Sequence, residues 1–155
     1  MSIQDFYILL SASALFGTIM GAYFGTIQYR ITVDEPLVTS YCSCPNCKTK
    51  LSIFFQIPIL SWIFLKGKCY YCKKTIPAKY PVIESCFLFF YTATFLLCYK
   101  NPILLVFIWI LFIMGILSLY CKNHFRSALK AFFIFLIYHL IYGGLFVIVS
   151  YALYT

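Results

Sequence analysis

Four cysteines are the residues of this chain whose type and spacing could do chemistry. Cys44 and Cys47 form one C-x2-C pair, and 21 residues separate it from a second pair, Cys69 and Cys72. Two such pairs about 20 residues apart are typical of a four-thiolate zinc site, in which two tight knuckles present a tetrahedral set of sulfurs. The spacing therefore predicts a structural zinc ion bound by these four thiolates.

The remaining cysteines leave alternatives open. One C-x2-C pair can do redox chemistry on its own, although two matched pairs favour a metal. Cys42 lies beside the first pair and is either a spare thiol or an alternative ligand. Cys86, Cys98 and Cys121 fall on apolar segments or at their edges, where a free cysteine packs as a small apolar residue.

The composition around this stretch indicates a membrane protein. Hydrophobic residues make up 63% of the 155 residues and charged residues 10%, whereas a soluble domain has about 25% charged residues. Apolar helices can cross lipid because their backbone groups bond internally. We expect an all-α polytopic membrane protein with about four transmembrane helices and a small zinc-ribbon-like loop domain between the first two. The expected spans are 6–29, 82–99, 103–121 and 131–154, and the loop domain is 30–81.

The basic residues predict the orientation. Eight of the 12 lysines and arginines lie from Arg30 to Lys79, and three lie from Lys122 to Lys130. Positively charged loops stay in the cytoplasm, so both stretches are expected there, with both termini on the outer side of the membrane. The net charge of +8 then reflects topology and attraction to anionic lipid, and it does not indicate nucleic-acid binding.

Two apolar features of the chain have competing interpretations. Leu51–Leu65 is uncharged but too short for a span, so it is either a small core over which the metal site closes or a patch on the membrane surface. Gly17, Gly21 and Gly25 recur at intervals of four, which puts them on one helix face that another helix can approach closely. Helix packing is therefore favoured for these glycines over the alternative of a ligand role.

Several motifs in register resemble the bacterial type IV prepilin leader peptidases over roughly residues 17 to 90. They are Gly21-Ala22-Tyr23-Phe24-Gly25 with Tyr29-Arg30, Cys44-Pro45-Asn46-Cys47, Gln56-Ile57-Pro58 with Ser61-Trp62, Lys66-Gly67-Lys68-Cys69 with Cys72, and Lys79-Tyr80-Pro81 with Glu84. The resemblance implies processing of prepilins or pseudopilins for pili, secretion or DNA uptake. Members of that family cleave the leader and N-methylate the new terminus with S-adenosylmethionine.

The chain departs from the family pattern at its carboxylates. The resemblance implies a peptidase dyad of two membrane aspartates, which must lie within hydrogen-bonding reach. This chain has only Asp5 and Asp34, at opposite ends of the first expected span and so about 30 Å apart. Ala22 and Gly25 also replace a serine and an asparagine of the family. We therefore expect the methylation-associated half, with the dyad supplied by a separate aspartyl peptidase subunit or another part of the gene.

Glu84 is the carboxylate of greatest interest, because it lies at a membrane boundary where a charge needs a partner or a purpose. Arg30 and Lys79 are expected at the same face. The three residues are catalytic candidates for a substrate or methyl-donor site, and the alternative is a structural ion pair. His139 is either a proton carrier or a hydrogen-bonded packing residue.

Two other functions compete with methylation. The chain could be a non-catalytic scaffold that holds a prepilin or a peptidase subunit through its glycine face and zinc module. It could also be a membrane thiol oxidoreductase, which metal analysis would distinguish because structural zinc is tightly held.

Overall fold

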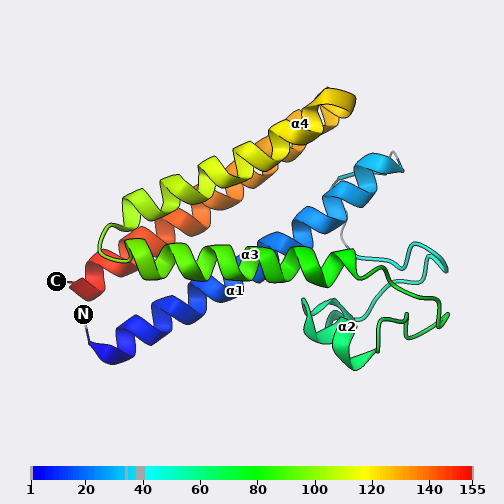
Figure 1. Cartoon of the computed structure of the whole chain (residues 1–155), viewed down its shortest axis with the longest axis horizontal. Coiled ribbons are helices and arrows are strands. Elements are labelled where there is room, and N and C mark those ends of the chain that lie inside the picture. The colour runs from blue at the N-terminus through cyan, green and yellow to red at the C-terminus, as the bar shows by residue number, and fades with distance from the viewer. Residues whose placement is uncertain (1, 34, 38–40, 155) are drawn as a thin grey trace. The chain divides into compact units, whose positions relative to one another are not determined.

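The computed structural model is helical throughout its long elements, as expected. It describes residues 2–33, 35–37 and 41–154, apart from the side chains of 117–128 and 154. Figure 1 shows the order of the elements, which are α1 (Ile3–Thr32), the short 3-10 helix η1 (Ile53–Gln56), α2 (Leu60–Phe64), α3 (Lys79–Cys98) and α4 (Pro102–Tyr154). The structure does not describe the side chains of Cys121 and of most of the predicted basic loop 122–130, which includes Lys122, His124 and Arg126.

Three helical segments are long and apolar enough to cross a membrane. They are Ile3–Thr32, Lys79–Cys98 and the Leu129–Leu153 limb of α4, while the Pro102–Ile116 limb is shorter. Together they suggest a multi-pass membrane protein.

Local chemistry sets where these helices begin and end. Ser2 and Asp5 cap α1 reciprocally, because the Ser2 N–H donates to Asp5 Oδ2 at 2.8 Å and the Asp5 N–H donates to Ser2 Oγ at 3.1 Å. Such a capping box satisfies backbone donors that the first helical turn leaves free. Arg30 lies in the last turn of α1, where a cation complements the helix dipole. Consequently α1 extends three residues beyond the predicted span 6–29 at each end.

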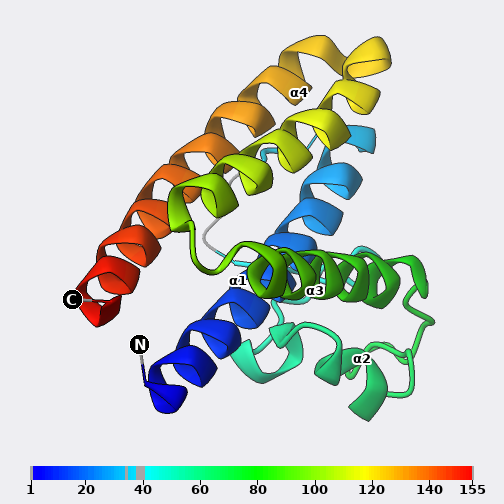
Figure 2. The ribbon, with the colours of Figure 1, turned by 60° about the vertical axis from the view of Figure 1, so that its left-hand side comes forward.

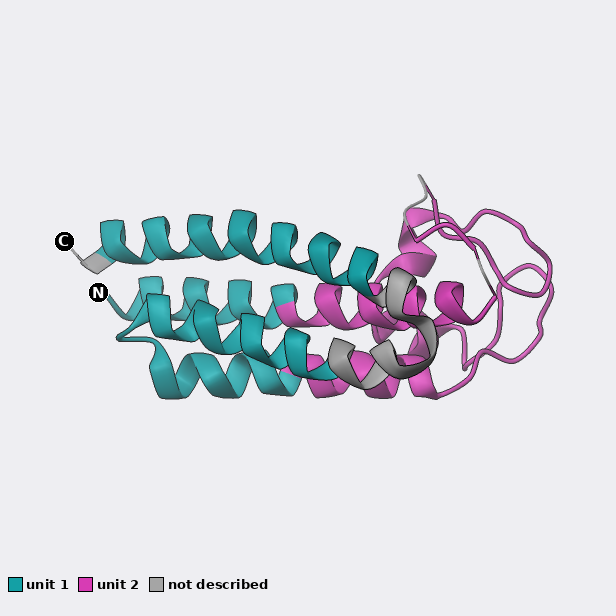
Figure 3. Ribbon diagram, turned by 90° about the horizontal axis from the view of Figure 1, so that it is seen from above, with its two compact units in different colours: residues 1–16, 89–155 teal, residues 17–88 magenta. Residues whose placement is uncertain are grey.

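The chain divides into two compact units, which Figure 3 shows in different colours. Gly17–Leu88 forms one unit, with most of α1, the cysteine-containing loop and the start of α3. The other unit contains Met1–Phe16 and Phe89–Thr155.

Close helix packing in the Gly17–Leu88 unit uses the glycine face of α1. A Cβ on Gly21 would lie 2.8 Å from the Cα of Glu84, and one on Gly25 would lie 3.2 Å from the Tyr80 ring. Phe24, on the same stretch, stacks on Phe87 with ring centroids 5.5 Å apart. The packing interpretation of Gly21 and Gly25 is thus confirmed, and their partner is α3 of the same chain.

In the unit that contains α4, the two described limbs of this helix lie side by side, as Figures 1 and 2 show. A Cβ on Gly143 would lie 2.7 Å from the Val106 side chain, and the Trp109 and Phe146 rings are 5.7 Å apart. Trp109 is almost fully buried, and its indole N–H donates to Thr94 Oγ1 of α3 at 2.9 Å. The unit is therefore held by aromatic packing with a few directed polar contacts.

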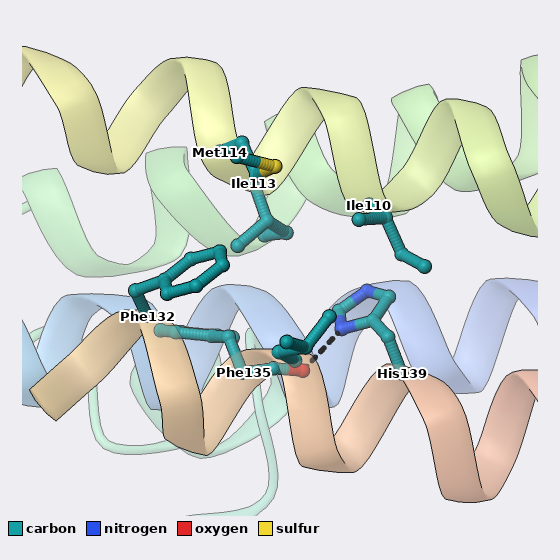
Figure 4. Close-up of a pocket in the computed structure, with 7 residues that line it drawn as sticks. Ile110, Ile113, Met114, Phe132, Phe135 and His139 are labelled. Atoms are coloured by element: carbon teal, nitrogen blue, oxygen red, sulfur yellow. Dashed lines mark hydrogen bonds between the residues drawn. The ribbon is translucent and has the colours of Figure 1, made fainter. Parts of the chain in front are cut away.

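His139 takes part in the most buried of these polar contacts. Its Nε2 lies 2.6 Å from the Tyr91 hydroxyl and its Nδ1 lies 2.8 Å from the Phe135 carbonyl oxygen. Since a carbonyl only accepts, Nδ1 carries the proton, and Nε2 of the neutral ring accepts from Tyr91. Figure 4 shows His139 at the edge of a hollow whose other lining residues are apolar. These contacts support the packing interpretation of His139.

Replacing Tyr91 by phenylalanine is expected to lower stability by about 1 kcal/mol, a typical value for a hydrogen bond between membrane helices. The change leaves His139 Nε2 buried without its hydroxyl donor. The thermal unfolding midpoint in one detergent measures the effect, and Tyr7→Phe, at a tyrosine that is 60% exposed, is the matched control. Equal midpoints for the two variants would contradict the role given to this bond.

Candidate metal centre

The two C-x2-C pairs come together in the structure. The sulfur atoms of Cys44, Cys47, Cys69 and Cys72 all lie within 4.8 Å of one another, and Cys44 Sγ is 3.9 Å from Cys72 Sγ. Zinc bound at about 2.3 Å by four sulfurs in a tetrahedron requires sulfur separations of about 3.8 Å. The cluster can therefore bind a metal such as zinc with little movement. Cys42, for which the sequence left open a spare thiol or an alternative ligand, is not among the four clustered thiols.

Each pair is held by the same backbone turn. The Cys44 N–H donates to the Thr49 carbonyl at 3.0 Å, and the Lys48 N–H donates to the Cys44 carbonyl at 2.9 Å. Twenty-five residues later the pattern repeats, with Cys69 N–H donating to Lys74 at 2.9 Å and Lys73 N–H donating to Cys69 at 3.0 Å. The two knuckles are thus copies of one local structure, although the sequence between them is not repeated.

A lysine follows the second cysteine of each knuckle in a left-handed backbone conformation. Lys48 has φ 56° and Lys73 has φ 58°. Glycine or asparagine usually occupies such positions, so the residue type gave no sign of the turn. The shared pattern Cys-x-x-Cys-Lys was the available signal. Antiparallel bridges Ser43–Lys50 and Lys68–Thr75 close the two turns.

The thiols influence one another's ionisation. Hydrogen bonding from the Thr49 hydroxyl and backbone lowers the pKa of Cys47 to about 6. The Lys74 backbone N–H favours the thiolate of Cys72, yet burial and the three neighbouring thiols together raise the pKa of Cys72 to about 11. Adjacent thiolates repel one another, so the cluster ionises stepwise. A divalent cation would relieve this repulsion, which is the electrostatic property expected of a metal site.

Gly67 turns the chain into the second knuckle. It has φ +68°, and a Cβ there would lie 2.9 Å from the Trp62 ring. The Trp62 indole N–H donates to the Ile76 carbonyl at 3.1 Å. The Trp62 and Lys66-Gly67-Lys68 motifs noted in the sequence therefore serve one purpose, which is to fix the entry to Cys69.

Glu84 binds a backbone group rather than a cation. Its Oε2 accepts from the Ile59 N–H at 2.6 Å, and Ile59 has the uncommon φ of 61°. Arg30 Nη1 donates to the Leu37 carbonyl at 2.7 Å, and Lys79 Nζ lies 5.3 Å from the centre of the Tyr80 ring. The structure thus does not join Glu84 to either expected cation, because its carboxylate is used to hold the turn before α2.

Replacing Glu84 by alanine is expected to release this turn. A hydrogen bond to a charged group is worth about 1.5–3 kcal/mol, and a β-branched residue with positive φ persists only when its surroundings enforce it. Trypsin should then cleave faster at Lys66 and Lys68, which follow α2. Glu84→Gln keeps an oxygen acceptor and is expected to be milder. If the two variants were digested at the unmutated rate, the anchoring role would be wrong.

An ion pair joins Lys48 and Glu35, two residues to which the sequence analysis gave no role. Lys48 Nζ lies 3.0 Å from Glu35 Oε1, and both side chains are exposed, so the pair contributes little to stability. Asp34 lies outside the described residues. Asp5 caps α1, so its carboxylate already has a structural role.

Comparison with known proteins agrees with the motifs. A family model described as the bacterial peptidase A24 N-terminal domain matches residues 15–98. The chain is 38% identical over 76 residues to a prepilin leader peptidase/N-methyltransferase of Bacillus subtilis, covering 49% of this chain and 31% of that protein. Proteins of the same name from Myxococcus xanthus and Vibrio cholerae are 31% and 27% identical over 85 and 89 residues, covering 54% and 52% of this chain and 25% and 35% of theirs. No solved structure matches.

The similarity is confined to one part of these relatives, because the chain spans a quarter to about a third of their length. Within this chain it covers the glycine face of α1, the cysteine cluster and Glu84, which are the features that the structure assembles in the Gly17–Leu88 unit. The chain belongs to the bacterial peptidase A24 N-terminal domain family.

Proposed function

We propose that this chain acts in the processing of type IV prepilins or pseudopilins as the zinc-containing part linked to N-methylation. The observation that carries the proposal is the coincidence of the family match over residues 15–98 with a four-sulfur cluster at the matched cysteines. The relatives carry the name prepilin leader peptidase/N-methyltransferase, and S-adenosylmethionine would be the methyl donor.

In this proposal Cys44, Cys47, Cys69 and Cys72 bind one zinc ion as a structural centre. All four cysteines are engaged by it, so the site has no open position of the kind that catalytic zinc keeps for water or substrate. The ion would order the loop from Tyr41 to Ala78 and so fix the surface that a substrate meets. The methyl transfer itself would use other groups.

The proposed topology has four spans in a bacterial plasma membrane. The three long apolar helices and the shorter limb Pro102–Ile116 support it, since the spans 103–121 and 131–154 each overlap one described limb of α4. Eight of the basic residues lie from Arg30 to Lys79, which favours a cytoplasmic cysteine loop and outward termini. Reporter fusions at the C-terminus and within the loop would report opposite sides of the membrane.

Leader cleavage needs carboxylates from elsewhere in this proposal. Asp5 is occupied in the cap of α1, and no aspartate follows Asp34 in these 155 residues. The paired aspartates of the peptidase step would be supplied by a second polypeptide or by sequence beyond this chain.

Methyl transfer to a cleaved pilin tests the proposal directly. The purified, zinc-loaded chain is incubated in lipid with a leader-free pilin and S-adenosylmethionine carrying a labelled methyl group. Label on the pilin N-terminus, lost in the presence of a competing S-adenosylhomocysteine, is the expected result. If no label is transferred either by the chain alone or with an aspartyl peptidase partner, the methylation function is wrong.

The contacts of α1 weaken the scaffold alternative, which relied on a glycine face available to a partner. Gly21 and Gly25 are in contact with α3 of the same chain, so these two positions are not free to hold a prepilin. The oxidoreductase alternative predicts easily oxidised thiols without metal, and zinc analysis of the purified chain separates it from the proposed centre.

A further inference from the structure

The stretch between the two knuckles exposes two of its three phenylalanines. Phe54 of η1 is 73% exposed and Phe64 of α2 is 79% exposed. Leu60 and Ile63 are also exposed, and positions three and four residues apart share one face of a helix. An apolar surface of this kind on a connecting loop marks an interaction site. It also rules out the interpretation of Leu51–Leu65 as a small closed core.

This surface lies beside a membrane-spanning helix, not beyond its end. The Ile59 N–H at the start of α2 is bound to Glu84 at 2.6 Å, and Glu84 is five residues inside α3, which begins at Lys79. At 1.5 Å per residue, this contact is about 8 Å along the helix from its first residue. Figures 1 and 2 show α2 next to the first part of α3. The bond therefore holds α2 at the level of the first turns of a candidate span.

The charge on the loop is of one sign. Between Tyr41 and Ile83 the sequence has seven lysines and no carboxylate. Lys66 and Lys68 follow α2 directly and Lys50 precedes η1, and all three are exposed. Apolar side chains flanked by lysines are suited to a bilayer surface, where the chains enter the acyl layer and the amines reach anionic headgroups.

We propose that residues 53–64 are embedded in the interfacial zone of the cytoplasmic leaflet, with Phe54 and Phe64 among the lipid chains. Lys50, Lys66 and Lys68 contact anionic headgroups. The inference rests on the proposed membrane topology and adds that the cysteine cluster is held against the bilayer instead of free in water. A membrane-anchored substrate would then meet the loop at the level where it leaves the lipid.

Lipid fits this surface better than an apolar protein helix does. A covering helix would satisfy the exposed phenylalanines but would leave the surrounding lysines without counter-ions. An anionic leaflet satisfies both, and the two ends of the loop are already tied to α1 and α3.

Depth measurements with spin labels test this inference without using the cysteines. In separate full-length chains, p-acetylphenylalanine replaces Phe54, Phe64, Asn46 or Phe89 and is coupled to a nitroxide. Asn46 is the exposed control in the first knuckle, and Phe89, which is 76% exposed on α3, is the control within a span. The chains are studied in nanodiscs containing one part phosphatidylglycerol to about two parts phosphatidylcholine, and zinc content is measured for each.

The collision rates of the nitroxide with oxygen and with a water-soluble nickel chelate distinguish lipid from water. We expect the oxygen-to-nickel ratio at 54 and 64 to be several-fold above that at 46 and to approach that at 89. Replacing phosphatidylglycerol by phosphatidylcholine should lower the ratio at 64.

Two results would overturn the inference while leaving the topology intact. One is an oxygen-to-nickel ratio at positions 54 and 64 that equals the ratio at position 46, while the ratio at position 89 indicates lipid. The other is protection of 54 and 64 from both reagents, which would show that protein covers the surface. A low oxygen-to-nickel ratio at position 89, which indicates water, would instead contradict the proposed membrane topology.

Discussion

Replacing Cys69 by serine is expected to remove the zinc ion and unfold the loop that surrounds it. Zinc content should fall from about one per chain to nearly none, because a four-sulfur site loses a ligand that no neighbouring group replaces. Structural zinc contributes an apparent 10–16 kcal/mol in small zinc-binding peptides, so this is the largest effect of a single substitution that we anticipate. The same outcome is expected for Cys44→Ser in the other knuckle.

The size of the effect follows from what the loop lacks. Between Tyr41 and Ala78 the buried residues are Cys44, Gly67 and Cys69, and every aliphatic and aromatic side chain there is at least partly exposed. Without an apolar core, a segment of this size does not fold on its own. The stability of the loop therefore depends on the cluster and on the two short hydrogen-bonded turns that form it.

Zinc analysis and limited proteolysis measure this prediction together. Trypsin should digest the Cys69→Ser chain at the loop lysines at least tenfold faster than the unmutated chain, while α1 and α3 stay protected in detergent or lipid. Cys42→Ser is the matched control, because Cys42 is near the first knuckle but outside the cluster. Full zinc retention in Cys69→Ser, or equal loss in Cys42→Ser, would show that the ligand set is wrong.

The cluster was predictable from sequence because its geometry is local. A C-x2-C pair needs only a tight turn, so the spacing of Cys44 and Cys47 and of Cys69 and Cys72 was enough to indicate it. Long apolar stretches likewise indicated α1 and α3. Their ends were less predictable, because Asp5 and Arg30 lie inside α1 through capping and dipole interactions that a hydropathy pattern does not report.

The environment of Glu84 could not be predicted in the same way. A carboxylate near Arg30 and Lys79 at a membrane boundary favoured an ion pair, but the actual partner is the N–H of Ile59. That partner depends on a positive φ at an isoleucine, which its residue type disfavours. The position is fixed only by tertiary contacts, so the sequence near Ile59 has no sign of it. The exposure of Phe54 and Phe64 was left open by the sequence, because an apolar stretch of this length fits a small core and a membrane-surface patch equally.

Replacing Gly21 by alanine is expected to push α1 and α3 apart. The added Cβ would lie 2.8 Å from Glu84 Cα and 3.0 Å from Phe87 Cβ. A backbone atom cannot rotate away, so the helices must separate or bend, and overpacking of this kind costs about 1–3 kcal/mol. Gly21→Leu is expected to cost more and to reduce the folded population strongly.

The comparison with two other glycines isolates the cause. At Gly25 the nearest atom is in the mobile Tyr80 ring, 3.2 Å away, and at Gly144 nothing lies within 4 Å. Alanine is favoured over glycine inside a helix by about 1 kcal/mol, so Gly144→Ala should raise the unfolding midpoint, Gly25→Ala should change it little, and Gly21→Ala should lower it. If the unfolding midpoints of the three variants rose by the same amount, helix propensity alone would explain the changes. A close contact at Gly21 would then be excluded.

The effect of Gly21→Ala should extend to the loop through Glu84. The residue whose backbone meets the new Cβ is the same residue whose carboxylate binds Ile59. Moving α3 away from α1 therefore also strains the attachment of α2, although Gly21 and Ile59 are far apart in the sequence. We expect tryptic cleavage after Lys66 to accelerate in Gly21→Ala while zinc remains bound, because the four cysteines are held by their own turns. Faster cleavage with zinc retained would distinguish this transmitted strain from loss of the metal centre. Loss of the metal centre would release the zinc and accelerate cleavage of the loop together.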